Sequence, residues 1–327
     1  MNGHIFISRQ QLSLYALAGV WGLALVVWPI GTNHLSVHED SRQVASGESL
    51  YKSQLTTANF GLLGVQFYES NDGVRRWNIR SHFAELHRKE NYAFQQQVEA
   101  EFYASLTGNI VFTKSDFGKS YLDKNQIELE GNVAVRSRRG YLFTMDRLTY
   151  FGEKHYFETK EPVIMRGPNP EVPMMQLRGV GMWADIDQEH FIMKHHVTAI
   201  RKLKSNETLR IQSNTGEFFT DDQKAVFRGG VRALMPSVVI DSDVFSLTIR
   251  DDKESIFAQG HVVLKNKDRV GHAEAAEIEI GSNQIVLEGK ASIDSKGSQI
   301  TGERITMYTD DDRIDVEEAQ GRVHQQQ

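Results

Sequence analysis

The feature of this sequence that most constrains its fold is a repeat of about 30 residues in the C-terminal half. Four short polar motifs mark it, TDDQ, RDDK, GSNQ and TDDD, and their turn residues lie 30, 31 and 28 residues apart. Asp187 and Gly152 continue the series upstream at intervals of 35 residues. Asp, Asn and Gly favour tight hairpin turns because they tolerate a left-handed backbone, and a repeat of this period defines the architecture of a chain. The four turn residues are Asp222, Asp252, Asn283 and Asp311.

Apolar and polar residues alternate between these turns. Ile278 and Ile280, for example, alternate with Glu277 and Glu279. A period of two predicts strands with one apolar face and one wet face, whereas a helix would need apolar residues at i, i+3, i+4 and i+7. A glycine recurs once in each unit, and we expect it to end the unit. These glycines are Gly230, Gly260, Gly289 and Gly321, and Pro162 and His196 occupy the place in two earlier units.

Charge and cysteine content narrow the classes of function. The net charge is −6, so no overall basic character argues for a nucleic-acid partner. The 327 residues contain no Cys, which excludes disulfides, thiolate metal sites and a cysteine nucleophile.

One long apolar segment, residues 12–30, lies near the N-terminus. Its 19 residues carry no charge and would span about 28 Å as a helix, enough for a bilayer core. Arg9 precedes the segment and Glu39 and Asp40 follow it, which favours a cytoplasmic N-terminus. The alternative is a cleaved signal peptide, but the segment is longer than a usual signal core and no clear small-x-small cleavage site follows. We therefore predict an uncleaved transmembrane helix.

The stretch FYESNDGVRRWNIRSHFAEL, beginning at Phe67, resembles the first hairpin of the LptC family. Its Asn-Asp-Gly is a hairpin turn that places Trp77 and Ile79 on one face. The resemblance continues through IELEGNVAV, GYLFTMDRLTYFGEKHYFETKEPVIM and MQLRGVGM and covers roughly residues 1–185. Residues 211–323 resemble the repeats of the related LptA family. The chain departs from a typical LptC by being far longer.

The resemblance implies a fold and a domain organisation. The expected fold is all-β, an elongated antiparallel β-jelly-roll of repeats with one N-terminal transmembrane helix. A parallel β-helix is the second candidate, and the hairpin turns favour antiparallel pairing. Residues 89–103 are expected to contain a strand, and the proline-rich residues 167–173 to form the joint between the two parts. The expected divisions are a cytoplasmic tail (1–11), the membrane helix (12–30), a linker (31–59), an LptC-like part (60–185), an LptA-like extension (186–323) and a short tail (324–327).

The resemblance also implies a function. LptC proteins are bitopic inner-membrane proteins of lipopolysaccharide export, so the bulk of this chain would be periplasmic. Lipopolysaccharide, an inner-membrane ABC transporter complex and a periplasmic or outer-membrane jelly-roll protein would be its partners. The alternative is a membrane-tethered structural or polysaccharide-binding repeat protein, and aliphatic rather than aromatic repeat positions favour lipid. The candidate lipid-binding residues are Trp77, Ile79, Leu129, Val133, Phe143, Phe218, Leu247, Ile249, Ile278, Ile280, Leu287, Ile305 and Met307.

The last repeat, residues 299–323, is expected to be an open edge. Only a short polar tail follows it, and an uncovered edge strand offers main-chain groups to a partner strand. The acidic residues between 310 and 318 leave an alternative reading, that they repel such a strand. The candidate docking residues are Phe60, Leu62, Ile300, Ile305, Val316 and Val323.

No motif indicates catalysis, so we expect neither an enzyme nor a cofactor or metal. His190, His195 and His196 form the only histidine cluster and read as exposed sheet residues. The Asp runs lack the Gly and distal Glu of a calcium loop, and there is no P-loop. We interpret two runs of basic residues as solvent-exposed faces of the sheet. The alternative is that these residues contact the phosphates of an anionic glycolipid. The two runs comprise Arg136, Arg138 and Arg139, and Arg201, Lys202 and Lys204.

Overall fold

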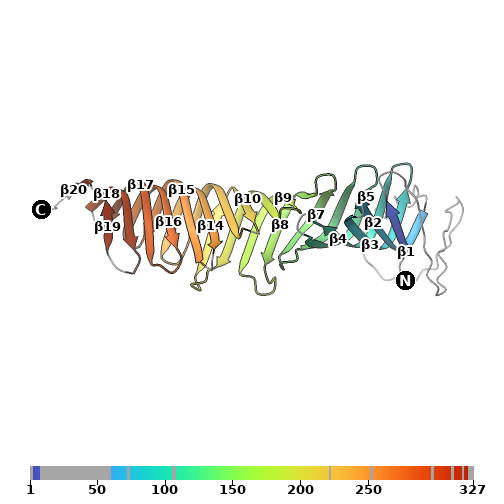
Figure 1. Cartoon of the computed structure of the whole chain (residues 1–327), viewed down its shortest axis with the longest axis horizontal. Helices are drawn as coiled ribbons and strands as arrows, with labels where there is room; N and C mark the ends of the chain where they lie inside the picture. Colours follow the sequence, from blue (N-terminus) through green and yellow to red (C-terminus); the bar gives the residue numbers. More distant parts are fainter. Residues whose placement is uncertain are drawn as a thin grey trace. The chain divides into compact units, whose positions relative to one another are not determined.

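The computed structural model describes residues 3–7, 60–71, 74–104, 108–220, 222–250, 253–295, 298–310, 313–318 and 320–322. All regular secondary structure in these residues is β-strand (Figure 1), which confirms the all-β prediction. No helix in this part of the chain has the length and apolarity needed to cross a bilayer. The predicted membrane helix, residues 12–30, lies outside the described residues.

The strands follow one another at short intervals. They are β1 (Gly3–Ile7), β2 (Phe60–Asn71), β3 (Val74–His87), β4 (Tyr92–Tyr103), β5 (Ile110–Tyr121), β6 (Gln126–Arg136), β7 (Leu142–Phe151), β8 (Tyr156–Gly167), β9 (Met175–Asp185), β10 (His190–Lys202), β11 (Thr208–Ser213), β12 (Thr215–Phe219), β13 (Lys224–Leu234), β14 (Val238–Arg250), β15 (Lys253–Asn266), β16 (Arg269–Glu279), β17 (Gln284–Ser295), β18 (Ser298–Tyr308), β19 (Ile314–Glu317) and β20 (Gln320–Arg322).

The chain divides into two compact units. Unit 1 comprises Met1–Arg138 and Met145–Phe157, and unit 2 comprises Arg139–Thr144 and Glu158–Gln327. In unit 1, strands β2 to β6 pair antiparallel in chain order around a core that includes Trp77, Ile79 and Phe102.

Strand β1 is the exception to antiparallel pairing, because it runs parallel to β2, with Gly3 opposite Val65 and Ile7 opposite Glu69. Residues 3–7 fall within the predicted cytoplasmic tail. A single membrane pass at residues 12–30 would put them on the other side of the membrane from β2. The β1–β2 pairing and the anchored topology therefore exclude each other in one molecule.

In unit 2, the long strands pair antiparallel in chain order, but the register of each pair breaks once, near mid-strand. Each strand thus contributes its two halves to two half-sheets. Half-sheet A contains 190–195, β12, 224–228, 244–250, 253–259, 275–279, 284–288, 304–308 and β19. Half-sheet B contains 197–202, β11, 231–234, 238–242, 262–266, 269–273, 291–295, 298–302 and β20. This arrangement is β-jelly-roll-like, and its antiparallel ladders are incompatible with a parallel β-helix.

The mid-strand register breaks form a corner. Gly260 has φ +79° and His261 has φ +46°, and they face Asp243 on the neighbouring strand. The His261 Nδ1 lies 2.7 Å from an Asp243 carboxylate oxygen. The same geometry recurs where Gly289 faces Glu274. The expectation that the glycines end each unit is therefore wrong: Gly230, Gly260 and Gly289 lie inside continuous strands, at left-handed bulges that turn the chain from one half-sheet to the other.

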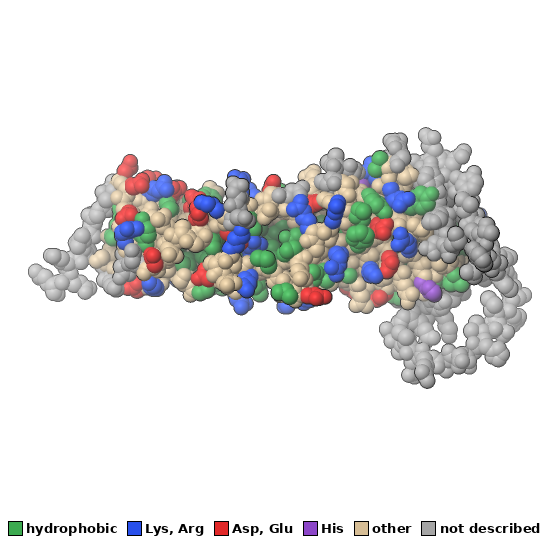
Figure 2. Space-filling model, turned by 60° about the horizontal axis from the view of Figure 1, so that its bottom comes forward, with side chains coloured by type: hydrophobic (Ala, Val, Ile, Leu, Met, Phe, Trp, Pro, Cys, Tyr) green, Lys and Arg blue, Asp and Glu red, His purple; other side chains and the backbone are tan. Residues whose placement is uncertain are grey.

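Most other local predictions are confirmed. Gly152, Asp187, Asp222 and Asn283 lie in turns, and Asn283 has φ +55°, as a tight turn requires. Asp252 and Asp311 lie outside the described residues. The strand predicted within residues 89–103 is confirmed as β4, and residues 168–174 form a loop. Charged side chains of both signs are interspersed on the face shown in Figure 2, as on a solvated surface.

Candidate functional site

The predicted lipid-binding residues lie in the interior of both units. Ile249 and Ile280 are half-buried, and Ile280 lies in the turn after β16. The other eleven are at most 9% exposed. Burial of this kind is expected both of a plain hydrophobic core and of a lipid-binding interior, so the lipid role of these side chains stays a prediction. The eleven are Trp77, Ile79, Leu129 and Val133 in unit 1, and Phe143, Phe218, Leu247, Ile278, Leu287, Ile305 and Met307 in unit 2.

The interior of unit 2 is built from apolar rows that cross the strands. Because cross-strand partners share a face, the pairing register identifies each row. The first row crosses half-sheet A through Phe191, Phe218, Ala225, Leu247, Ile256, Ile278, Ile285, Met307 and Ile314. A row of half-sheet B runs through Leu177, Ala199, Ile211, Ala233, Ile240, Leu264, Gly271, Ile293 and Ile300.

The two half-sheets face each other across this interior. The ideal Cβ position at Gly271, in half-sheet B, lies 2.7 Å from a methyl group of Leu287, in half-sheet A. Glycine at this point therefore lets the opposing leucine approach the backbone. An apolar space between two such sheets needs no special polar groups to hold an alkyl chain.

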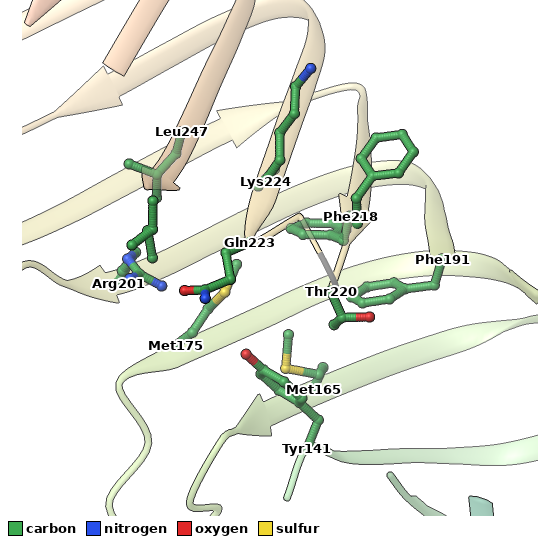
Figure 3. A pocket seen from close by; sticks show the side chains of 13 residues that line it. Tyr141, Met165, Met175, Phe191, Arg201, Phe218, Thr220, Gln223, Lys224 and Leu247 are labelled. Carbon is green, nitrogen blue, oxygen red and sulfur yellow. The ribbon is translucent and has the colours of Figure 1, made fainter. Parts of the chain in front are cut away.

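The two half-sheets leave a pocket of about 80 Å³ in unit 2 (Figure 3). Phe191 and Phe218 form one wall as a stacked pair, with ring centroids 4.6 Å apart and planes at 12°. Phe143 meets Phe191 edge-on at 5.1 Å. Three predicted residues, Phe218, Leu247 and Ile249, line this pocket, and sequence reasoning missed the rest. The missed residues are Tyr141, Met165, Met175, Phe191, Arg201, Phe219, Thr220, Gln223, Lys224 and Ala225.

One charged pair lies beside the pocket. The Arg201 Nη2 of half-sheet B lies 2.8 Å from the Glu254 Oε1 of half-sheet A, and the two side chains are 14% and 1% exposed. The backbone N–H of Lys204 donates a 2.8 Å hydrogen bond to the other Glu254 oxygen. Arg201, which the sequence analysis placed on a solvated basic run, thus points inward. Its alternation with Val197 and Ala199 on β10 was the signal for this placement.

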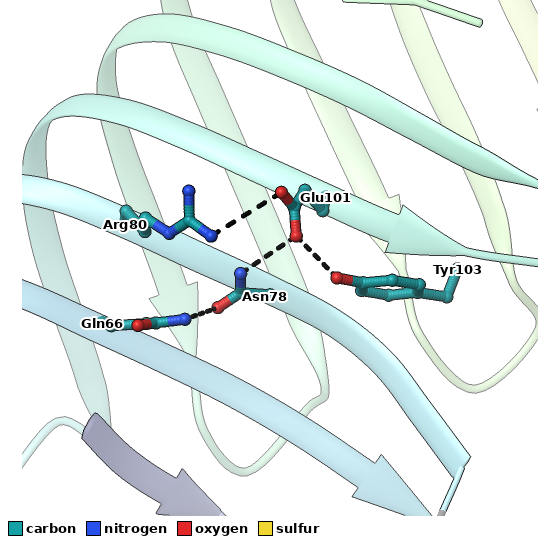
Figure 4. Close-up of polar contacts among 5 residues, drawn as sticks. All are labelled: Gln66, Asn78, Arg80, Glu101 and Tyr103. Carbon is teal, nitrogen blue, oxygen red and sulfur yellow. Dashed lines mark hydrogen bonds and ion pairs between the residues drawn. The ribbon is translucent and has the colours of Figure 1, made fainter. Parts of the chain in front are cut away.

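Unit 1 carries a polar network on the face opposite its core (Figure 4). Gln66 Nε2 donates to Asn78 Oδ1 at 2.6 Å, and Asn78 Nδ2 donates to Glu101 Oε2 at 3.1 Å. The Tyr103 hydroxyl donates to the same Glu101 oxygen at 2.5 Å. Burial raises the pKa of Glu101, but the Tyr103 and Asn78 hydrogen bonds and the Arg80 charge outweigh it, so the pKa lies below its ordinary value. Burial and the bond to Glu101 raise the pKa of Tyr103.

The predicted histidine cluster has ordinary surroundings. His190 stacks on Phe219 with centroids 4.5 Å apart and contacts Glu217 at 3.0 Å, whereas His195 and His196 are exposed. No group of three His, Asp or Glu side chains among the described residues could hold a metal ion.

The predicted docking residues lie in β2, β18 and β19. Phe60 and Leu62 are half-buried, and the Arg88 guanidinium lies 4.6 Å from the Phe60 ring centroid. Ile300 and Val316 are half-buried, but Ile305 is fully buried opposite Val316. The last described strands are β19 and β20, which both pair with β18, and Val323 lies outside the described residues.

Comparisons with known proteins match two consecutive stretches of the chain. Residues 66–202 match the family described as lipopolysaccharide-assembly, LptC-related. Residues 210–313 match the family described as LptA/(LptD N-terminal domain) LPS transport protein. The predicted division at residues 185/186 falls inside the first match.

The remaining comparisons add less. No curated protein matches the chain. A solved structure, LptH from Pseudomonas aeruginosa, described as the LptA homologous periplasmic component of a lipopolysaccharide transport device, is similar at 19% identity and a TM-score of 0.33, over 34% of this chain and 82% of that chain. By the two family matches, the chain belongs to the Lpt proteins, with an LptC-related region followed by a region related to LptA and the N-terminal domain of LptD.

Proposed function

We propose that this protein carries lipopolysaccharide from the inner membrane across the periplasm, with the acyl chains held between half-sheets A and B. The observation that carries the proposal is the succession of an LptC-related and an LptA/LptD-related region on one chain. In this proposal residues 12–30 anchor the chain in the inner membrane beside an ABC transporter complex. The anchored state requires β1 to leave β2.

The interior of unit 2 supports the lipid part of the proposal. Both half-sheets contribute apolar rows, and the row of half-sheet A lines, through Phe191, Phe218 and Leu247, a pocket whose walls are mainly aromatic and aliphatic. Aligned rows across successive strands would give an acyl chain equivalent surroundings at each strand, so in this proposal the ligand moves from strand to strand along the rows without a large barrier. The chain acts in this proposal as a carrier and not as an enzyme.

A binding assay with labelled lipopolysaccharide tests the proposal. Leu247→Asp, at the pocket wall, should abolish binding, because an unpaired buried charge is strongly unfavourable. Thr248→Asp, one residue further on the opposite face of β14, should bind like wild type and serves as the control. Circular dichroism must show that both variants are folded.

The same assay separates lipid binding from sugar binding. Deacylated lipopolysaccharide retains the sugars and phosphates but lacks the chains, and we expect it to bind far more weakly. Equal binding of the deacylated form, or undiminished binding by folded Leu247→Asp, would contradict the proposal and favour the polysaccharide-binding alternative.

A further inference from the structure

The buried ion pair between Arg201 and Glu254 is unexpected in an interior made of apolar rows. Such a pair contributes little net stability, because desolvation of the two charges offsets their attraction, and an apolar pair of similar volume often does as well. Its presence at these two inward positions therefore calls for a role other than stability.

The position of the pair suggests that role. Arg201 is the second-last residue of β10 and Glu254 the second residue of β15, so both lie at strand ends, away from the mid-strand corner. Glu254 pairs across the strands with Ile249, which lines the pocket, as Arg201 itself does. The charged pair thus spans the two half-sheets beside the apolar walls of the pocket.

Arg201 also has unused bonding capacity. Its Nη2 binds Glu254, but its Nε is buried and has no hydrogen-bond partner. A guanidinium presents several donors in a fixed plane and matches the oxygens of a phosphate or carboxylate. Glu254 keeps a second partner, the Lys204 backbone N–H, if it releases Arg201.

We propose that Arg201 exchanges Glu254 for the anionic group of an amphiphile whose alkyl chain occupies the pocket. The ligand class is an acyl or alkyl chain that ends in a phosphate or a carboxylate. In this proposal the alkyl chain lies against Phe191, Phe218 and Leu247, and the anionic group pairs with Arg201; these four side chains line the same pocket (Figure 3). Glu254 then holds Arg201 neutralised and correctly placed while the pocket is empty. This inference rests on the proposed function and adds a headgroup contact to it.

Three probes test the exchange on the full chain: dodecyl phosphate, neutral dodecyl maltoside, both below their micelle-forming concentrations, and inorganic phosphate. Wild type should bind dodecyl phosphate roughly ten- to a hundredfold more tightly than the neutral probe, the range expected of hydrogen bonds to a charged group. Inorganic phosphate alone should bind weakly, because it lacks the chain. Tight binding of inorganic phosphate that matches dodecyl phosphate would overturn the proposal in favour of a free-phosphate site.

Variants of Arg201 and of Glu254 should change the affinity for dodecyl phosphate in opposite directions. Arg201→Gln should reduce binding of dodecyl phosphate to the level of the neutral probe. Glu254→Gln removes the competing carboxylate, so it should tighten binding of dodecyl phosphate several-fold and leave the neutral probe unchanged. A purely structural ion pair predicts weaker binding of both probes in both variants. Arg232→Gln, in the exposed Arg232–Asp241 pair of β13 and β14, is the matched control and should change nothing.

A double variant keeps the test valid if the single variants unfold. Arg201→Met with Glu254→Leu replaces the pair by apolar side chains of similar size, and should bind the neutral probe normally while losing the preference for the anionic one. Retained preference in this folded variant would refute the headgroup contact. If wild type binds both alkyl probes equally, or binds neither, the inference fails, and the separate assay with labelled lipopolysaccharide decides the proposed function.

Discussion

The corner glycines allow the folding argument to be tested at single positions. Gly260 has φ +79°, and an added Cβ would lie 2.5 Å from an Asp243 carboxylate oxygen and 2.9 Å from the Asp243 Cβ. The carboxylate can rotate away, but the Asp243 Cβ is fixed to the backbone, so the strand itself must shift. Gly230 has φ +58° and nothing within 4 Å of the same position, and is therefore a matched control for backbone conformation alone.

The expected magnitudes follow from these contacts. A left-handed backbone costs an alanine about 1–2 kcal/mol, and this applies to both Gly230→Ala and Gly260→Ala. The clash at Asp243 adds about 1–3 kcal/mol at Gly260 only, in the range of overpacked sites. With about 2–4 °C per kcal/mol for a domain of this size, Gly260→Ala should lower the melting temperature roughly twice as much as Gly230→Ala.

Thermal unfolding combined with hydrogen exchange would measure the effect. Amides of β14 and β15 near the corner should lose protection in Gly260→Ala and keep it in Gly230→Ala, because opening is local in such arrays. Equal losses of stability in the two variants would refute the role assigned to the Asp243 contact.

Three further predictions concern the polar network of unit 1, the predicted membrane helix at residues 12–30 and the last repeat. Because the pKa of Glu101 is lowered on folding, its contribution to stability is present above its ordinary value of 4.5 and is lost as the pH falls through the lowered folded pKa. Tyr103→Phe removes a hydrogen bond to Glu101, so acid unfolding should begin at a higher pH, and an unchanged midpoint would contradict this reading. The mature protein should keep residues 1–30 and fractionate with the inner membrane; a mature N-terminus after residue 30 in protein sequencing would show cleavage. Deletion of residues 299–327 should leave a folded protein that no longer passes lipopolysaccharide to a jelly-roll partner, and normal transfer by that protein would exclude docking through the last repeat.

The sequence predicted the strands and turns well because these depend on local patterns. Alternation of apolar and polar side chains set the strands, and Asp, Asn or Gly marked the turns at Gly152, Asp187, Asp222 and Asn283. The corner was missed because a glycine inside an alternating pattern resembles the end of a strand. A second sequence signal for the corner lies on the strand before each bulge glycine, where a serine is followed by Asp or Asn. These pairs are Ser115–Asp116, Ser213–Asn214 and Ser242–Asp243. In each case the serine hydroxyl donates to the carbonyl two residues later, as at Ser242 and Val244.

The pocket was harder to predict for a different reason. Each bulge interrupts the alternation, so inward positions cannot be followed through a whole strand by counting in twos. On β14, Val238 and Ile240 are buried before the bulge, whereas Phe245 and Leu247 are buried after it. Arg201 lies among charged neighbours in sequence, which concealed its alternation with Val197 and Ala199, and its register with Met175 and Leu209 shows that it lies inside. Long-range pairing, which no local pattern specifies, thus decides which residues meet at the pocket.

The most direct test of the central claim compares an inward and an outward phenylalanine in the folded protein. Phe218 is 3% exposed and lines the pocket, whereas Phe257 on β15 is 40% exposed. A photoreactive benzoyl-phenylalanine at either position keeps the ring already present and adds a benzoyl group, so circular dichroism must first show that both labelled proteins are folded. After loading with lipopolysaccharide and irradiation, the protein labelled at position 218 should form a lipopolysaccharide adduct and the protein labelled at position 257 should not. Adduct formation at position 257 alone, or at neither position in a folded and loaded protein, would contradict a lipid-carrying interior.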